Sequence, residues 1–267
     1  MISTPLLSIL RTRIQQKYRT ISYPRGTPPP LPDRFLGKPE IGSFSCPSGC
    51  DYCLKECPTG SLFLKEGKIH LDTGTCLFCG VCSKLCPAGM IQFGNEYRLA
   101  ARERSDLLVS QVKGKDISDA RHEMASRIFK RSLKLRQVSA GGCAACEADC
   151  NVLTTIGWDI GRFGIQFVAS PRHADGLLIT GPVTENMKQA LEKTYRAVPH
   201  PKIVLAVGSC AIGGGPYRDH PEQLNGAGSV LPIDLYIPGC PPHPLTILDG
   251  ILRFLDKIPG REEPWEL

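Results

Sequence analysis

Eight of the thirteen cysteines in this 267-residue chain lie in two short runs, each ending in a Cys-Pro step. The second run reads Cys76-x2-Cys79-x2-Cys82-x3-Cys86-Pro87, which is the spacing of bacterial [4Fe–4S]-binding sequences. The first run reads Cys46-x3-Cys50-x2-Cys53-x3-Cys57-Pro58 and has one extra residue between its first two cysteines. The insertion contains Pro47 and Gly49, which a tight turn can absorb. The two runs therefore predict a ferredoxin-like segment that binds two clusters.

In runs of this kind the fourth cysteine ligates the cluster of the other run. We therefore expect one [4Fe–4S] cluster on Cys46, Cys50, Cys53 and Cys86, and a second on Cys76, Cys79, Cys82 and Cys57. Zinc is the first alternative, but zinc sites usually pair two Cys-x2-Cys knuckles around one ion and do not use four cysteines per run. Disulfides are the second alternative, and they would imply secretion.

The chain is too long for a ferredoxin alone, which needs only the stretch from about residue 42 to residue 93. No apolar run approaches the roughly 20 residues of a membrane helix. The apolar residues near the N-terminus precede the basic ones, which is the reverse of a signal peptide. We therefore expect a cytoplasmic chain that does not span the membrane and lies on its cytoplasmic face through a complex.

The net charge of +6 is uneven, with basic stretches near the N-terminus and after residue 97. Such stretches suit anionic lipid, an acidic partner protein or nucleic acid, or are solvated faces. The chain has no nucleic-acid motif, and its basic residues are not interleaved with aromatic ones. Contact with a membrane complex or a partner subunit is the preferred interpretation.

The composition of the first 135 residues changes along the chain and predicts several segments. Residues 5–18 have the periodicity of a short amphipathic helix, and residues 24–32 contain five prolines, which predicts an extended strap. Residues 61–64 and 68–71 predict a hairpin around Glu66-Gly67. Residues 97–135 are charged and predict one or two helices, with a break near Gly114.

After residue 134, short apolar runs alternate with helical patterns. The predicted strands are 135–139, 165–169, 177–180, 203–207 and 235–237, and the predicted helices are 147–156, 185–198 and 244–255. This alternation predicts a parallel sheet with helices on both faces, and ligands of such sheets lie beyond the carboxyl ends of the strands.

The remaining cysteines follow those strand ends. Cys143 and Cys146 come after the first predicted strand, Cys210 after the strand at 203–207, and Cys240 after the strand at 235–237. Four thiolates at one sheet edge, with glycines beside them, predict a third [4Fe–4S] cluster, and zinc fits the ligand number equally well. Cys150 lies on the following predicted helix and is interpreted as a packed thiol.

The motifs around these cysteines resemble a known subunit family. Cys143-Ala144-Ala145-Cys146-Glu147, Ser170-Pro171-Arg172-His173-Ala174-Asp175, Gly208-Ser209-Cys210 and Pro238-Gly239-Cys240-Pro241-Pro242 resemble the small subunit shared by group 4 [NiFe] hydrogenases and respiratory complex I. The N-terminal part resembles the two-cluster ferredoxin subunit of the same complexes. The chain thus resembles a fusion of two subunits. Cys-x2-Cys at the first position and His173 resemble the hydrogenase branch more than the complex I branch.

The resemblance implies an α+β ferredoxin-like domain with two [4Fe–4S] clusters, followed by an α/β flavodoxin-like domain with a parallel sheet. We expect a helix and strap at 1–40, the ferredoxin domain at 41–96, a helical linker at 97–134 and the small-subunit-like domain at 135–267. The expected cofactors are three [4Fe–4S] clusters.

The expected function is electron transfer to or from a hydrogenase-type large subunit carrying [NiFe]. The other expected partners are an electron donor or acceptor protein and membrane subunits, with no nucleic acid. No residue is predicted to be catalytic, and Glu147, Arg172 and His173 are expected near the third cluster. The alternatives are a relay subunit of a complex I-like quinone oxidoreductase and a stand-alone iron–sulfur carrier.

Overall fold

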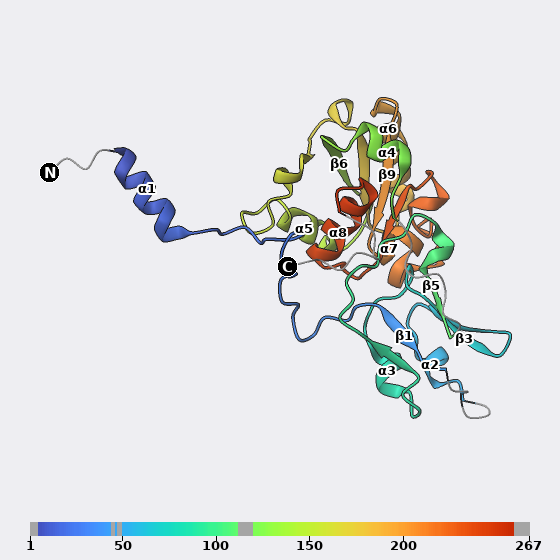
Figure 1. The fold of residues 1–267 in the computed structure, drawn as a ribbon. Coiled ribbons are helices and arrows are strands. Elements are labelled where there is room, and N and C mark those ends of the chain that lie inside the picture. The colour runs from blue at the N-terminus through green and yellow to red at the C-terminus, as the bar shows by residue number, and fades with distance from the viewer. Residues whose placement is uncertain (1–4, 44–45, 47–49, 112–119, 259–267) are drawn as a thin grey trace.

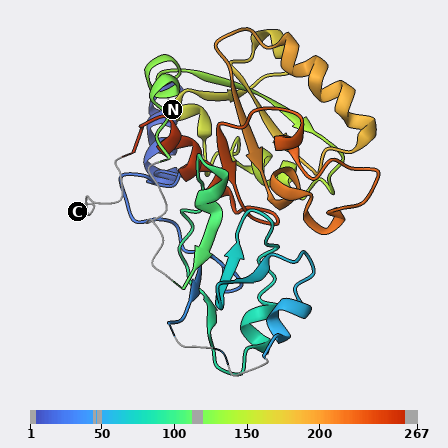
Figure 2. The same cartoon turned by 90° about the vertical axis from the view of Figure 1, so that its right-hand side faces the viewer.

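The computed structural model describes residues 5–43, 46, 50–111 and 120–258. It contains a cysteine-rich region in the first half of the chain and an α/β region in the second half. Figure 2 shows the cysteine-rich region, in light blue to green, below the yellow-to-red second half, with the dark-blue N-terminal helix beside the second half. The predicted insertion residues Pro47 and Gly49 and the predicted break near Gly114 lie outside the described residues.

The second half is built on a five-stranded parallel sheet. Its strands are β6 (Leu133–Ser139), β7 (Ile165–Phe167), β8 (Gly176–Thr180), β9 (Ile203–Val207) and β10 (Leu235–Ile237). Their spatial order is β10-β9-β8-β6-β7, and every neighbouring pair is parallel. This is the strand order of a flavodoxin-like sheet. The predicted fold class and all five predicted strands are confirmed, with small differences at their ends.

Helices cover both faces of this sheet. One face packs against α4 (Glu123–Ile128), α5 (Ala145–Val152) and α8 (Pro244–Phe254), in a core that includes Leu135, Leu205 and Ile251. The other face packs against α6 (Glu185–Ala197), with Leu177, Ile179 and Leu191 in a second core. β8 and β9 are buried along their whole length, as expected of central parallel strands. Short turns complete the region: α7 (Ser209–Gly213), η2 (Ile160–Phe163), η3 (Pro171–His173), η4 (Gly215–Tyr217) and η5 (Ala227–Ser229).

The cysteine-rich region consists of short strands and two single-turn helices. β1 (Pro39–Ile41) pairs antiparallel with β4 (Ile91–Phe93), so the two ends of the region meet. β2 (Leu62–Lys65) and β3 (Lys68–Asp72) form the predicted hairpin, and α2 (Tyr52–Lys55) and α3 (Val81–Leu85) lie in the two cysteine runs.

The expected helical linker is only partly helical. Its regular elements before β6 are the turn η1 (Arg104–Leu107), the strand β5 (Leu108–Ser110) and α4. β5 pairs antiparallel with β3 and completes a three-stranded sheet. Ala101 also forms an isolated bridge to Tyr236 of β10. The prediction of a helical linker is therefore wrong for residues 108–110, because backbone pairing to the ferredoxin hairpin overrides their helix-compatible composition.

The N-terminal segment contacts α8, the last helix of the chain. Helix α1 (Pro5–Gln16) projects from the body, and the extended strap after it returns to the second half (Figure 1). Tyr23 donates its hydroxyl to the buried carboxylate of Asp249 in α8 at 2.5 Å, and Arg162 donates to the carbonyls of Ile21 and Tyr23 at 2.7 Å. Among the described residues, no helix has the length and apolarity needed to cross a bilayer.

Candidate metal centres

The thiols of Cys46, Cys50, Cys53 and Cys86 form the first group. Cys53 lies in α2, and Cys86 follows α3, so the fourth thiol comes from the other run, as predicted. Burial raises the pKa of Cys53, and the charges of Cys86, Cys46 and Cys50 raise it further. The pKa of Cys46 is raised by burial and then by Cys50 and Cys86. Cys46 and Cys53 are thus both close to the thiols of Cys50 and Cys86.

The second group consists of Cys57, Cys76, Cys79 and Cys82, which line one small apolar pocket with Leu62, Leu71 and Phe93. Burial raises the pKa of Cys76 to about 12 and that of Cys82 to about 11, and the charges of other thiols in the group contribute.

Cys57 has the opposite shift. Burial acts to raise its pKa, but hydrogen bonds from the backbone N–H groups of Thr59, Ser61 and Leu62 outweigh it, and the pKa is lowered. Cys57 therefore becomes a thiolate more readily than Cys76 or Cys82.

The third group forms at the carboxyl edge of the parallel sheet. Cys143 and Cys146 follow β6, Cys210 lies in α7 after β9, and Cys240 follows β10. Burial raises the pKa of Cys210 to about 11, with contributions from Cys240, Cys143 and Glu147. Burial also raises the pKa of Cys146, and Cys210, Glu147, Cys150 and Cys240 add to this shift. The four cysteines predicted for this edge are thus brought together.

Two glycines make room for these thiols. A Cβ atom on Gly208, whose φ is +91°, would lie 2.5 Å from the Sγ of Cys146. A Cβ atom on Gly215, whose φ is +57°, would lie 2.5 Å from the Sγ of Cys210. Neither contact is tolerable, so both positions require glycine for conformation and for space.

Hydrogen bonds to sulfur add to the fit of the first two groups for iron–sulfur clusters. Backbone N–H groups donate from Ser61 to Cys57 at 3.3 Å, from Phe78 to Cys76 at 3.3 Å and from Met90 to Cys86 at 3.2 Å. Such bonds are a means by which proteins tune cluster potentials. Among the described residues, no three His, Cys, Asp or Glu side chains lie close enough to hold a single metal ion.

Glu147 and Cys150 lie where the sequence predicts them. Glu147 follows Cys146 and accepts a hydrogen bond from Thr180 at 2.7 Å, so it does lie beside the third group. Cys150 is completely buried in the core, as expected of a packed thiol.

Arg172 and His173 do not lie beside the third group. They are exposed in η3, before the amino end of β8, whereas the cysteines follow the carboxyl ends of the strands. β8 has five residues, and a strand rises by about 3.3 Å per residue. The amino end of β8, next to η3, is therefore roughly 15 Å from the carboxyl edge that holds the cysteines. The expectation that these two residues lie near the third group is therefore wrong.

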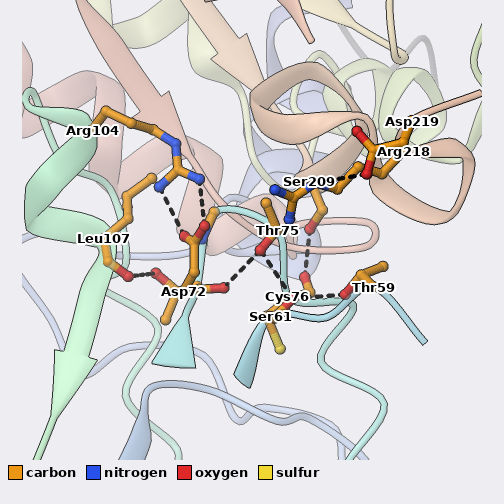
Figure 3. A network of polar contacts seen from close by, with 12 residues as sticks. Thr59, Ser61, Asp72, Thr75, Cys76, Arg104, Leu107, Ser209, Arg218 and Asp219 are labelled. Carbon is orange, nitrogen blue, oxygen red and sulfur yellow. Dashed lines mark hydrogen bonds and ion pairs between the residues drawn. The ribbon is translucent and has the colours of Figure 1, made fainter. Parts of the chain in front are cut away.

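The second and third groups meet at a buried junction that the sequence did not indicate (Figure 3). The hydroxyl of Ser209, next to Cys210, donates to the carbonyl of Cys76 at 2.5 Å and is 1% exposed. Burial, then Cys143 and then Cys79 raise the pKa of Cys240, so Cys240 is close to a thiol of each group. A Cβ atom on Gly213 would lie 2.5 Å from Cγ2 of Thr75, which shows how closely α7 packs on the cysteine loop.

A polar network holds the ferredoxin side of this junction. Arg104 forms a two-point ion pair with Asp72, and Thr75 donates to the hydroxyl of Ser61 at 3.0 Å. Thr59 and Ser61 are hydrogen bonded at 2.6 Å, and Figure 3 shows these side chains around the Cys76 loop. Arg104 belongs to the linker between the two halves. The linker therefore helps to hold the loop that carries Cys76.

Removing the Ser209 hydroxyl tests this junction. Ser209→Ala leaves the buried carbonyl of Cys76 without this donor, which costs about 1–3 kcal/mol. We expect amide hydrogen exchange in residues 73–79 to become about tenfold faster, measured by mass spectrometry, with an unchanged iron content. Ser229→Ala is the matched control, because Ser229 donates only within its own loop, to Gly226. Unchanged exchange in Ser209→Ala would show that this hydrogen bond does not hold the two regions together.

Comparison with known proteins identifies relatives of both halves. The family model "NADH ubiquinone oxidoreductase, 20 Kd subunit" matches residues 143–254, and the model "4Fe-4S dicluster domain" matches residues 45–90. A probable membrane-bound hydrogenase subunit of Pyrococcus furiosus is 39% identical over 132 residues, covering 49% of this chain and 79% of the relative.

The names of two further relatives refer to other complexes. An NADH-quinone oxidoreductase subunit of Clostridium beijerinckii is 43% identical over 118 residues, covering 44% of this chain and 70% of the relative. Formate hydrogenlyase subunit 7 of Escherichia coli is 36% identical over 160 residues, covering 60% of this chain and 62% of the relative.

Proposed function

Because the chain belongs to the family of the 20 kDa subunit of NADH ubiquinone oxidoreductase and also carries a 4Fe-4S dicluster domain, we propose that it relays electrons through three [4Fe–4S] clusters to or from a hydrogenase-type large subunit. At the coarser level it is an iron–sulfur electron-transfer subunit of a hydrogenase- or complex I-like complex. The proposed ligands are the twelve cysteines of the three groups. The division into domains at residues 41, 97 and 135 is part of the same proposal.

The order of the three groups is the observation that carries this proposal. Cys53 of the first group contributes to the raised pKa of Cys82 in the second group. Cys79 of the second group contributes to that of Cys240 in the third group. The second group thus has a neighbouring thiol in each of the other two groups, and this supports a linear relay through it.

When bound, [4Fe–4S] clusters supply one-electron redox chemistry. The residues of the chain bind these groups, space them and adjust their potentials. The N–H groups of Ser61, Phe78 and Met90 donate to ligand sulfurs in the first two sites, and hydrogen bonds of this kind stabilise the more negative, reduced state. Glu147 adds a carboxylate beside the third site, held by Thr180.

The third group is the proposed contact with the large subunit. Cys143 and Cys240 are exposed, whereas Cys210 is buried, so this group is open on one side. A redox group with an open side exchanges electrons most readily with a partner that covers it. This exposure favours a complex subunit over a stand-alone carrier.

A complex I-like quinone oxidoreductase is the second candidate, and the similarity to the NADH-quinone oxidoreductase subunit of Clostridium beijerinckii favours it. The two candidates differ in the large subunit. We expect the co-purifying large subunit to contain nickel and the complex to turn over hydrogen. A large subunit without nickel, in a complex that reduces quinone, would replace the first candidate by the second.

Metal analysis tests the number of clusters. Anaerobically purified protein is expected to contain about twelve iron atoms and about twelve acid-labile sulfides per chain. The double variant Cys143→Ser/Cys240→Ser is expected to contain about eight of each, because only the third group loses ligands. Cys150→Ser is the control and should retain about twelve, since that thiol lies in the core. About eight iron atoms in the unmodified chain, or zinc in place of the missing iron, would contradict three clusters.

A further inference from the structure

Helix α1 presents an apolar stripe to solvent. Leu7, Leu10 and Ile14 are spaced by three and four residues, so they lie on one face of the helix. Their exposed fractions are 61%, 51% and 74%, and the helix stands away from the body in Figure 1. Three large exposed apolar side chains on one face of a helix indicate a surface that becomes covered in use.

Basic residues border this stripe on both sides. Arg11 is four residues after Leu7 and three before Ile14, so it lies beside the stripe. Arg13 is three residues after Leu10 and four after Ile9, so it lies on the other side of the stripe, between it and Ile9, which is 64% exposed. Both are exposed, and long basic side chains at such borders extend towards charged headgroups while their stems cover apolar surface.

The charge of the whole segment has one sign. Residues 5–32 contain five basic residues and no Asp or Glu. A segment of this kind is attracted to an anionic surface over a distance of about a Debye length.

The segment is attached to the body just after the helix, at Thr20 and Ile21. It joins the body through Thr20, which donates to the carbonyl of Ile156 at 3.0 Å, and through Ile21, which donates its N–H to the carbonyl of Gly157 at 2.9 Å. Ile156 is itself 75% exposed, so the body also presents an exposed apolar side chain at the point of attachment.

We propose that α1 is an interfacial helix that binds the surface of an anionic lipid bilayer directly. The apolar stripe enters the boundary between headgroups and acyl chains, and Arg11 and Arg13 contact lipid phosphates on either side. Charge decides between a bilayer and a protein groove, because a groove would cover the stripe without needing cations on both of its borders. The proposal does not depend on which reaction the large subunit performs.

Vesicle flotation of the full chain with its clusters tests this proposal. We expect binding to vesicles of phosphatidylcholine with phosphatidylglycerol, and at least tenfold weaker binding to phosphatidylcholine alone or at high salt, from about a fivefold effect per basic residue. Arg11→Gln/Arg13→Gln should weaken binding to the anionic vesicles about tenfold or more. Leu10→Gln/Ile14→Gln should weaken it on both kinds of vesicle.

Lys188→Gln/Lys193→Gln on the exposed side of α6 is the matched control, since it removes the same charge elsewhere. It should leave binding to the anionic vesicles within about twofold of the original chain. Equal loss in both charge variants would show that net charge, and not α1, attracts the chain, and would overturn the proposal. So would failure of the full chain to bind anionic vesicles while α1 variants lose a membrane subunit from the complex, because the stripe would then be covered by protein.

Discussion

Replacing Gly208 with alanine is expected to remove the third cluster while leaving all twelve proposed ligands in place. The Cβ atom would lie 2.5 Å from the Sγ of Cys146, and the φ of +91° disfavours any side chain. Backbone and thiol therefore cannot both keep their positions. We expect the iron content to fall from about twelve to about eight atoms per chain, with the electron paramagnetic resonance signals of the first two clusters retained.

Gly67→Ala is the control for backbone strain. Gly67 has a φ of +72° in the β2–β3 turn, and a Cβ atom there meets nothing within 4 Å. This substitution imposes a similar conformational penalty of about 1–2 kcal/mol but approaches no thiol. It should retain about twelve iron atoms. Retention of about twelve iron atoms in Gly208→Ala as well would mean that Cys146 does not need this close approach, and would contradict its role as a ligand.

Replacing Asp249 with alanine is expected to cause a large loss of stability. This side chain is 1% exposed, accepts a hydrogen bond from Tyr23 at 2.5 Å and pairs with Arg253 at 3.0 Å. Asp249→Ala removes the anion and leaves the Arg253 cation, which is 14% exposed, without this partner. Removal of one member of a buried pair costs about 3–5 kcal/mol. We expect the apparent free energy of unfolding in urea to fall by that amount, measured anaerobically by circular dichroism.

Glu192→Ala is the matched control, because Glu192 and Arg196 have the same i,i+4 arrangement on α6 but are 35% and 78% exposed. It should cost less than about 1 kcal/mol. Tyr23→Phe should cost about 1–3 kcal/mol, since it removes the hydrogen bond from the strap and keeps the ion pair. A loss in Asp249→Ala no larger than that in Glu192→Ala would show that the strap is not held at this point.

Much of the second half could be predicted from the sequence, because its signals are local. β8 and β9 are short apolar runs, and in a parallel sheet such runs are buried on both faces, so periodicity and length identify them. Once these strands are parallel, Cys143, Cys210 and Cys240 must meet at one edge, since all three follow carboxyl ends.

The parts that could not be predicted depend on contacts between distant residues. β5 has no strong strand pattern of its own, and its conformation comes from pairing with β3. Ser209 is an ordinary helix-start residue in the sequence, and only the fold brings its hydroxyl to the carbonyl of Cys76. The predicted position of Arg172 and His173 was wrong, because their motif does not indicate whether it lies at the amino or the carboxyl end of a strand.

The contact between Tyr23 and Asp249 joins positions 226 residues apart. A ribosome makes the chain from its N-terminus at about 5–20 residues per second, so both ferredoxin runs leave it before α8 exists. Tyr23 cannot bind Asp249 during that interval, and the α8 side of the fold stays open. The strap can therefore close on α8 only after the last helix has been made, which is several seconds after both cysteine runs have been synthesised.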